Sequence, residues 1–87
     1  MLPINGKRKD NNMEKGILQY NSYTKRYEFF PDNGGEETAL HCGNCLDVYN
    51  TVTGKWKSTR IEVSRGEWYL VGTKFFGEGL EGLKVRF

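Results

Sequence analysis

The residues best suited to chemistry lie in the run His41-Cys42-Gly43-Asn44-Cys45. A Cys-x-x-Cys turn can place two thiolates on one metal ion, but structural zinc needs four ligands. The chain has only one His and two Cys, and Asp47 is a poor fourth ligand. A complete metal site at His41, Cys42 and Cys45 would therefore need a second chain. We interpret the run as a structural turn, with a metal site as the alternative.

A redox role is a further alternative for this pair of cysteines. Reactive Cys-x-x-Cys pairs usually lie at the N-terminus of a helix, whose dipole stabilises the thiolate, whereas Cys45 leads into a predicted strand. His41 precedes the pair, so the Cys-x-x-Cys-His order of haem attachment is not met. We expect no cofactor and two free thiols, as a cytoplasmic protein would have.

Other catalytic motifs are missing from the sequence. The glycines between Gly77 and Gly82 lack the Lys-Ser/Thr ending of a phosphate-binding loop and a following helix. The single histidine is placed in a turn, and no nucleophile motif lies beside it. We therefore predict that the chain is not an enzyme.

Binding residues are a stronger prediction than catalytic ones. On a strand from Trp56 to Val63, alternation puts Trp56 on the outer face with Arg60 and Glu62, and a surface network of ion pairs is the simplest role for the charges. An exposed tryptophan beside an arginine also suits peptide binding or base stacking. The predicted partner is an unknown protein or nucleic acid, and the predicted site is Trp56, Arg60, Glu62, Arg86 and Tyr69.

Four tyrosines offer a second possibility. Tyr20, Tyr23, Tyr27 and Tyr69 are expected to be half-buried cover of the core, or to line a groove of the kind that binds proline-rich peptides. We favour the half-buried cover, which is the commoner role of such rings.

The element that must position these residues is a hairpin from Lys55 to Gly72. Thr59, Ile61 and Val63 are predicted to face the core, and the turn is Ser64-Arg65-Gly66-Glu67. The following strand, Trp68 to Val71, is apolar on both faces, which is typical of a central strand covered on both sides.

Short strands with turns between them fill the rest of the chain. Further strands are predicted at 16–20, 26–30, 45–49 and 83–87, and a short helical turn at 36–39. Five or six short antiparallel strands predict an all-β fold, and an SH3-like barrel fits the chain length best. A barrel of the OB type is the alternative, although it usually needs a longer chain and a helix.

Length and charge limit the remaining possibilities. The 87 residues predict one domain, from 14 to 87, after a flexible arm at 1–13. The arm carries Lys7-Arg8-Lys9, a solvated tail or a phosphate-seeking segment, and Met13 is an alternative start. A net charge of +2 does not by itself indicate nucleic acid. No apolar run is long enough for a membrane span, so we expect a cytoplasmic protein.

The order of several short motifs resembles domain-of-unknown-function family 5348, which comprises small bacterial proteins. The resemblance covers nearly everything after the arm and implies a bacterial, cytoplasmic, all-β domain. It implies no biochemical activity. The motifs are Gly16-Ile17-Leu18-Gln19-Tyr20, Arg26-Tyr27, Leu40-His41-Cys42-Gly43, Leu46-Asp47-Val48, Trp56, Arg60-Ile61-Glu62, Trp68-Tyr69-Leu70-Val71-Gly72 and Gly82-Leu83-Lys84-Val85-Arg86.

Overall fold

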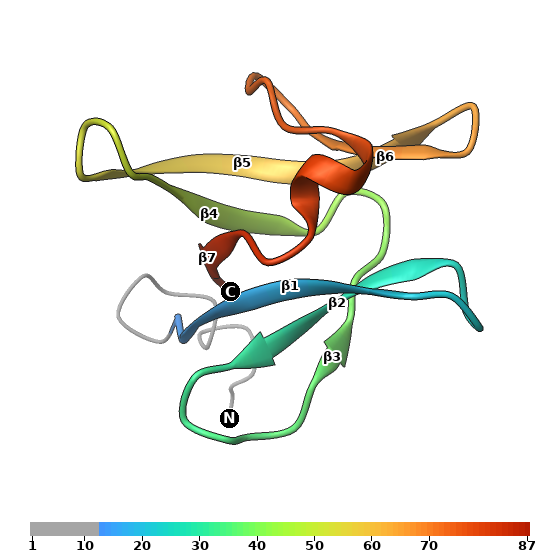
Figure 1. The fold of residues 1–87 in the computed structure, drawn as a ribbon, viewed down its shortest axis with the longest axis horizontal. Coiled ribbons are helices and arrows are strands. Elements are labelled where there is room, and N and C mark those ends of the chain that lie inside the picture. Colours follow the sequence, from blue (N-terminus) through green and yellow to red (C-terminus); the bar gives the residue numbers. More distant parts are fainter. Residues whose placement is uncertain (1–12) are drawn as a thin grey trace, which may run out of the picture.

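The computed structural model describes residues 13–87, which form an all-β unit with one short 3-10 helix (Figure 1). The predicted arm, apart from Met13, and its basic run Lys7-Arg8-Lys9 lie outside the described residues. The elements are β1 (Lys15–Asn21), β2 (Arg26–Pro31), β3 (Thr38–Ala39), β4 (Cys45–Asn50), β5 (Lys55–Ser64), β6 (Glu67–Leu70), η3 (Gly77–Leu80) and β7 (Lys84–Arg86).

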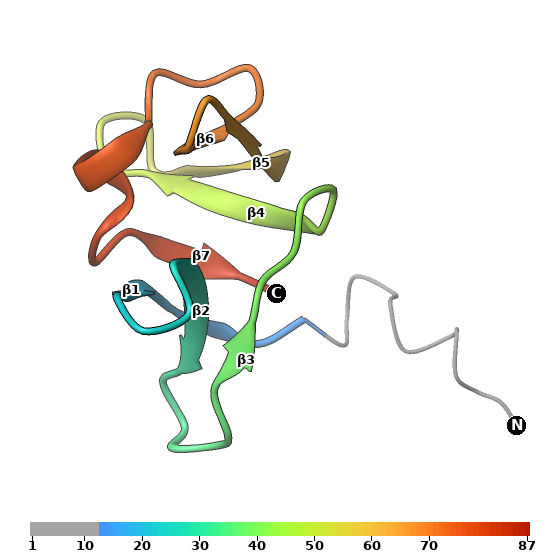
Figure 2. The ribbon, with the colours of Figure 1, turned by 90° about the vertical axis from the view of Figure 1, so that its right-hand side faces the viewer.

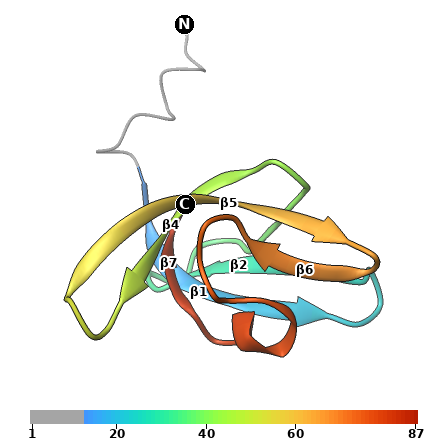
Figure 3. The ribbon, with the colours of Figure 1, turned by 90° about the horizontal axis from the view of Figure 1, so that it is seen from above.

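All seven strands of the described residues belong to one antiparallel sheet with the order β3-β2-β1-β7-β4-β5-β6. The last strand, β7, pairs with β1 on one side and with β4 on the other. It therefore joins the hairpin β1–β2 to the meander β4–β5–β6, and Figure 2 shows it between the two. The sheet is curved, so that β5 and β6 lie over β1 and β2 (Figure 3).

The sheet is open within residues 13–87, because β3 and β6 are its two edges and no ladder joins them. The all-β class predicted from the sequence is confirmed. The strand count exceeds the predicted five or six because Thr38–Ala39, expected as a helical turn, forms β3. Leu40 donates its backbone N–H to the Tyr27 carbonyl at 2.9 Å, which holds this segment extended along β2.

Alternating burial explains why these strands fold together. Along β1 and β2, Leu18 lies opposite Phe29, and both are buried. Ile61 of β5 and Leu70 of β6 are another opposed and fully buried pair. The curved sheet encloses one hydrophobic core, which contains Leu18, Tyr27, Phe29, Leu40, Leu46, Val48, Ile61, Trp68, Leu70, Leu80 and Val85.

Two residues of β5 depart from the predicted core face. Thr59 is only half-buried, and its Oγ1 donates to the Val71 carbonyl at 2.6 Å. Val63 is 36% exposed, so its prediction as a core residue is wrong. It lies next to the hairpin turn at the end of the sheet, where its larger partner Trp68 reaches the core and the short valine does not.

The predicted central position of the strand after that turn is also wrong, because β6 is at an edge of the sheet. Its outer side is covered by the following segment: Tyr69 bridges to Phe76, and Leu70 donates its N–H to Phe75 at 3.1 Å. Apolar residues on both faces of β6 correctly indicate that the strand is shielded from water. The shielding comes from the loop that returns along β6 and not from another strand.

The β5–β6 turn itself forms where the sequence predicts it. Its central residues Arg65 and Gly66 have φ of +53° and +81°, the pattern of a type I′ turn, whose twist matches that of the strands. Glycine adopts this conformation readily, while arginine does so at a cost in energy. The turn therefore contains one well-suited and one strained residue.

Candidate binding surface around Trp56

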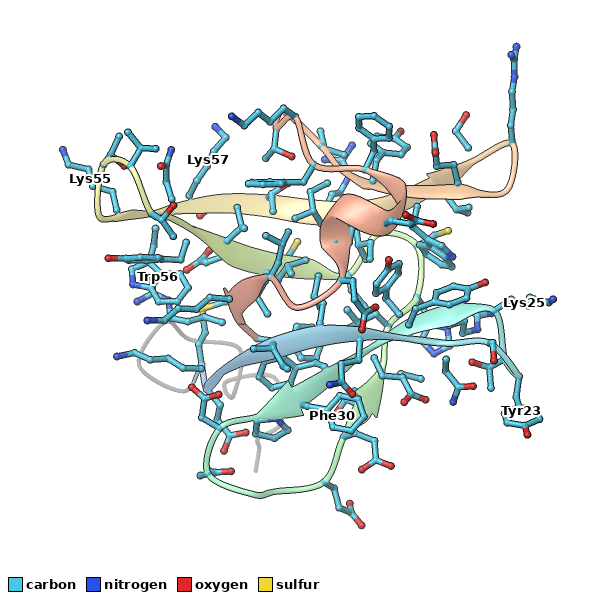
Figure 4. All side chains as sticks on the ribbon, in the orientation of Figure 1. Tyr23, Lys25, Phe30, Lys55, Trp56 and Lys57 are labelled. Carbon is cyan, nitrogen blue, oxygen red and sulfur yellow. The ribbon has the colours of Figure 1, made fainter. Side chains whose placement is uncertain are left out.

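Trp56 lies on the outer face of the sheet, opposite Tyr49 of β4. The two rings make an edge contact with centroids 5.0 Å apart and planes at 61°. The guanidinium of Arg86 lies over the Trp56 ring, 4.4 Å from its centroid. Trp56 is half-buried and does not belong to the core cluster, so its cover comes from these surface neighbours. Figure 4 shows it at one end of the molecule.

Arg86 is fixed in place by Asp47. Its Nε and Nη2 donate to the same carboxylate oxygen, Oδ2, at 3.1 and 2.7 Å. The other oxygen, Oδ1, accepts from Ser58 at 3.2 Å. Arg86 pairs with Asp47 and not with Arg60 or Glu62, because β7 lies beside β4 and brings Arg86 opposite Asp47.

Arg60 and Glu62 form the ion pair predicted for them, with Nε and Oε2 2.8 Å apart. The Arg60 side chain is 54% exposed, and an exposed pair of this kind contributes only about 0–1 kcal/mol. Four residues of extended strand separate Trp56 from Arg60, or about 13 Å. The arginine that contacts Trp56 is consequently Arg86 and not its predicted neighbour Arg60.

Tyr69 lies near the Arg60–Glu62 pair and not near Trp56. It is half-buried, stands opposite Glu62 in the β5–β6 ladder, and lines a surface hollow with Phe75 and Phe76. The five predicted binding residues therefore separate into two groups. Trp56 and Arg86 form one, and Arg60, Glu62 and Tyr69 form the other.

Three residues of the Trp56 group were missed in the sequence. Asp47 and Tyr49 share the outer face of β4, and the Lys84 ammonium of β7 lies 4.7 Å from the centroid of the Tyr49 ring. Alternation along 45–50 places Asp47 and Tyr49 on one face, so the sequence pattern does indicate that these two residues are neighbours. That β7 pairs with β4 is a long-range contact, which alternation within a strand does not reveal. We call Asp47, Tyr49, Trp56, Lys84 and Arg86 the Trp56 surface.

The cysteine run is a turn attached to β5. Gly43 donates its N–H to the Ile61 carbonyl at 2.8 Å, and the Ile61 N–H donates to the Asn44 carbonyl at 3.0 Å. The Asn44 side chain accepts from the His41 N–H at 2.8 Å. Cys42 and Cys45 are exposed and free. Residues 13–87 contain no group of three or more His, Cys, Asp or Glu placed to hold a metal ion.

The four tyrosines do not share one groove. Tyr20 and Tyr27 are adjacent, with ring centroids 5.2 Å apart, whereas Tyr23 is 96% exposed in the hairpin loop and Tyr69 lines another hollow. Tyr27 is buried, and its hydroxyl donates to the Gly77 carbonyl at 2.8 Å. Burial raises the pKa of Tyr27 above its ordinary value, and the nearby Glu81, Tyr20 and Glu78 raise it further.

Comparisons with known proteins give one family and one solved relative. A family model described as a domain of unknown function (DUF5348) matches residues 16–87. The crystal structure of a protein from Ruminococcus gnavus is similar over 85% of this chain and 100% of that chain, with a TM-score of 0.72 and 37% sequence identity. No curated protein matches the chain. Within the described residues, no helix has the length and apolar character needed to cross a membrane.

Proposed function

Because the chain belongs to the DUF5348 family, whose description names no activity, we propose a function from its surface: a non-catalytic module that binds a protein or a nucleic acid through the Trp56 surface. The observation that carries the proposal is the guanidinium of Arg86 stacked on Trp56 outside the core. Tryptophan and arginine are the residue types most often found at the centres of binding interfaces.

The arrangement is organised before any partner arrives. Asp47 fixes the Arg86 guanidinium by two hydrogen bonds, and Tyr49 supports the Trp56 ring from its edge. Side chains that are already ordered lose less conformational entropy when a partner binds. A ring and a fixed cation side by side provide apolar area together with directional hydrogen bonding.

The charge of this surface is compatible with either predicted class of partner. Lys84 and Arg86 contribute two cations, and Lys15 lies opposite Arg86 in the β1–β7 ladder. Asp47 is the counter-charge of Arg86. Such a surface suits the phosphates and bases of a single strand or the carboxylates of an acidic protein. Salt dependence separates the two, because phosphate contacts release counterions and weaken steeply as salt rises.

The alternative function, metal binding or redox chemistry at Cys42 and Cys45, is less well supported. Their turn is held mainly by backbone hydrogen bonds to β5, and the Cys45 thiol adds a contact of 4.0 Å to the Gly43 carbonyl, so the fold does not require a bound metal ion. Zinc measurement on the purified protein, together with thiol titration, tests this alternative directly. Stoichiometric zinc that protects both thiols would favour it over the binding module.

Two finer predictions are part of this proposal. The wrapping of two hairpins around a single core, with β7 between them, supports the SH3-like assignment of the sheet. Exposed, free Cys42 and Cys45 fit the reducing conditions of the cytoplasm, where we place the protein.

The binding proposal is tested with three versions of the chain: wild type, Trp56→Ala, and Tyr23→Ala as the matched control. Tyr23 is an exposed aromatic residue in a loop outside the Trp56 surface. Each version is titrated with fluorescent single-stranded RNA and DNA at two salt concentrations and, separately, used for affinity capture followed by mass spectrometry. We expect wild type and Tyr23→Ala to retain the same ligand and Trp56→Ala to lose it. Equal behaviour of Trp56→Ala and wild type in both assays would overturn the proposal.

A further inference from the structure

A second surface lies at the other end of the molecule, where the β5–β6 turn approaches β1, β2 and η3. It is a hollow of about 370 Å³ whose lining includes Tyr20, Tyr27, Trp68, Glu67 and Glu78. The Lys25 carbonyl accepts the Trp68 indole N–H at 3.1 Å, which places the hollow near Lys25. Figure 4 shows Lys25 and Trp56 at opposite ends of the molecule.

The aromatic wall of this hollow is held rigidly, and its polar tips are already used. The Tyr27 hydroxyl donates to Gly77, and the Trp68 indole donates to Lys25. Tyr20 packs against Tyr27 and remains 43% exposed. The wall therefore presents the faces and edges of fixed rings, which attract apolar groups and cations.

Two carboxylates in the hollow are engaged in no ion pair. The side-chain carboxylates of Glu67 and Glu78 make no hydrogen bond or ion pair with any residue in the range 13–87, although the Glu78 backbone carbonyl accepts the Glu81 N–H at 3.1 Å. A Cβ atom added at Gly77 would come within 2.9 Å of Glu67 Oε2, and the φ of Gly77 is +56°. The absence of a side chain at Gly77 thus provides the space that the Glu67 carboxylate occupies.

The balance of charge in the hollow is negative. Arg65 is a cation in the lining, against the two carboxylates Glu67 and Glu78. A third carboxylate, Glu81, accepts the Tyr20 N–H at 2.9 Å. Burial raises the pKa of Tyr27, and Glu81 and Glu78 raise it further, as expected for carboxylates close to the aromatic wall.

A second hollow adjoins the first at Glu67. Glu67, Gly77 and Glu78 also line this neighbouring depression of about 480 Å³, whose lining further includes Phe75, Phe76 and one cation, Lys74. Phe76 is 59% exposed. Because the two hollows share these three residues, they lie side by side, and we call them together the track. This arrangement suits a linear ligand better than a compact one.

We propose that this track binds an extended polypeptide segment and that the hollow between Tyr20, Trp68, Glu67 and Glu78 receives its arginine or lysine side chain. A cation there gains charge-assisted hydrogen bonds from the carboxylates and cation–π attraction from the rings. Flanking apolar residues of the segment lie along Phe76. An acidic or phosphorylated ligand is disfavoured, because it would face two unpaired carboxylates. This site is separate from the Trp56 surface and does not depend on it.

The test starts from a phage-displayed library of random twelve-residue peptides selected on the immobilised full chain. The proposal predicts enrichment of sequences with a central Arg or Lys beside apolar residues. A selected peptide is then measured by calorimetry against wild type, against Glu67→Gln with Glu78→Gln, and against Glu36→Gln with Glu37→Gln. The last variant makes the same chemical change at two exposed positions outside the hollow.

Binding should weaken by about tenfold or more in the Glu67/Glu78 variant, as expected for loss of charge-assisted bonds, and stay at the wild-type level in the Glu36/Glu37 variant. Replacing the central arginine of the peptide by neutral citrulline should weaken its binding to the wild-type protein by about as much as the Glu67/Glu78 substitutions do. This measurement needs no protein variant. Selection of acidic or purely apolar peptides, no selection at all, or equal affinity of the citrulline peptide would overturn the proposal.

Discussion

The hydroxyl of Tyr27 donates a 2.8 Å hydrogen bond to the carbonyl of Gly77 and so ties β2 to the start of η3. The two residues are far apart in sequence, and the bond fixes one wall of the hollow in which Glu67 lies. The bond also explains why a tyrosine can be buried here, because the only polar atom of its side chain has a hydrogen-bond partner.

Tyr27→Phe should therefore destabilise the protein although the ring remains. The Gly77 carbonyl loses its partner, and we expect the free energy of unfolding to fall by about 1–2 kcal/mol. Urea unfolding monitored by tryptophan fluorescence measures this. Tyr23→Phe, at a 96% exposed position, is the control and should match wild type. Equal stability of Tyr27→Phe and wild type would show that the bond contributes nothing.

The raised pKa of Tyr27 predicts a dependence of stability on pH. When the pH exceeds 10.0, the ordinary pKa of tyrosine, Tyr27 in the unfolded chain releases its proton, while Tyr27 in the folded chain still retains it. The unfolded state then binds fewer protons, so stability falls as pH rises. Below pH 10 the contribution is fully present. Between pH 9 and pH 11, wild type should lose more stability than Tyr27→Phe, and parallel losses would contradict this.

Truncation to alanine should lower the free energy of unfolding much more at the core position Ile61 of β5 than at Val63, which lies next to the turn. Ile61 is fully buried, and Ile61→Ala should cost roughly 2–4 kcal/mol through lost burial and a cavity. Val63 is on the same strand but 36% exposed, and Val63→Ala should cost less than about 1 kcal/mol. Chemical denaturation of both variants checks the difference, and equal losses would show that β5 faces the core in another way.

The strained Arg65 offers a stabilising substitution. Asparagine tolerates positive φ better than arginine, and Asn-Gly is the preferred central pair of a type I′ turn. Arg65→Asn should therefore raise the free energy of unfolding by about 0.5 kcal/mol. Arg65→Ala keeps the strain and should change stability by less than about 0.5 kcal/mol. Thermal melts compare the two, and a destabilised Arg65→Asn would contradict the turn geometry.

The Trp56–Arg86 stack should appear as a coupling energy. Arg86 lies 4.4 Å from the ring centroid at a partly exposed site, where such contacts contribute about 0.5–1 kcal/mol. A double-mutant cycle of Trp56→Ala and Arg86→Gln measures the coupling separately from the Asp47 hydrogen bonds. The same cycle with Arg60→Gln in place of Arg86→Gln should give nearly zero. If the cycle showed coupling of Trp56 to Arg60 and none to Arg86, Arg60 would be the neighbour of Trp56, as alternation predicts.

Local patterns in the sequence predict the strands of this fold well, and long-range pairing limits the rest. The burial of Ile61 and the turn at Arg65-Gly66 are indicated by the order of residues, and both are confirmed, whereas Val63 departs from the predicted core face. Nothing in the sequence near Arg86 indicates that its strand lies between β1 and β4. The pairing of Arg86 with Asp47 therefore could not be predicted, and the wrong arginine was assigned to Trp56.

The prediction that Trp68 to Val71 form a central strand is wrong for a similar reason. β6 lies at an edge of the sheet, and its cover comes from the loop that returns through Phe75 and Phe76. Hydrophobicity reports that a strand is shielded from water and not what shields it. The same loop forms the track beside Glu67, so the surface proposed for peptide binding was equally hidden from sequence patterns.

The central position of β7 has a consequence for folding. β7 joins the two parts of the sheet, so until residues 84–86 pair, β1–β2 and β4–β5 share no ladder, and β1 and β4 each present an unpaired edge. The hairpins form early because their contacts are local, whereas joining the two parts requires contacts of high sequence separation, which form slowly. The partly folded chain therefore exposes two strand edges to other molecules until β7 docks.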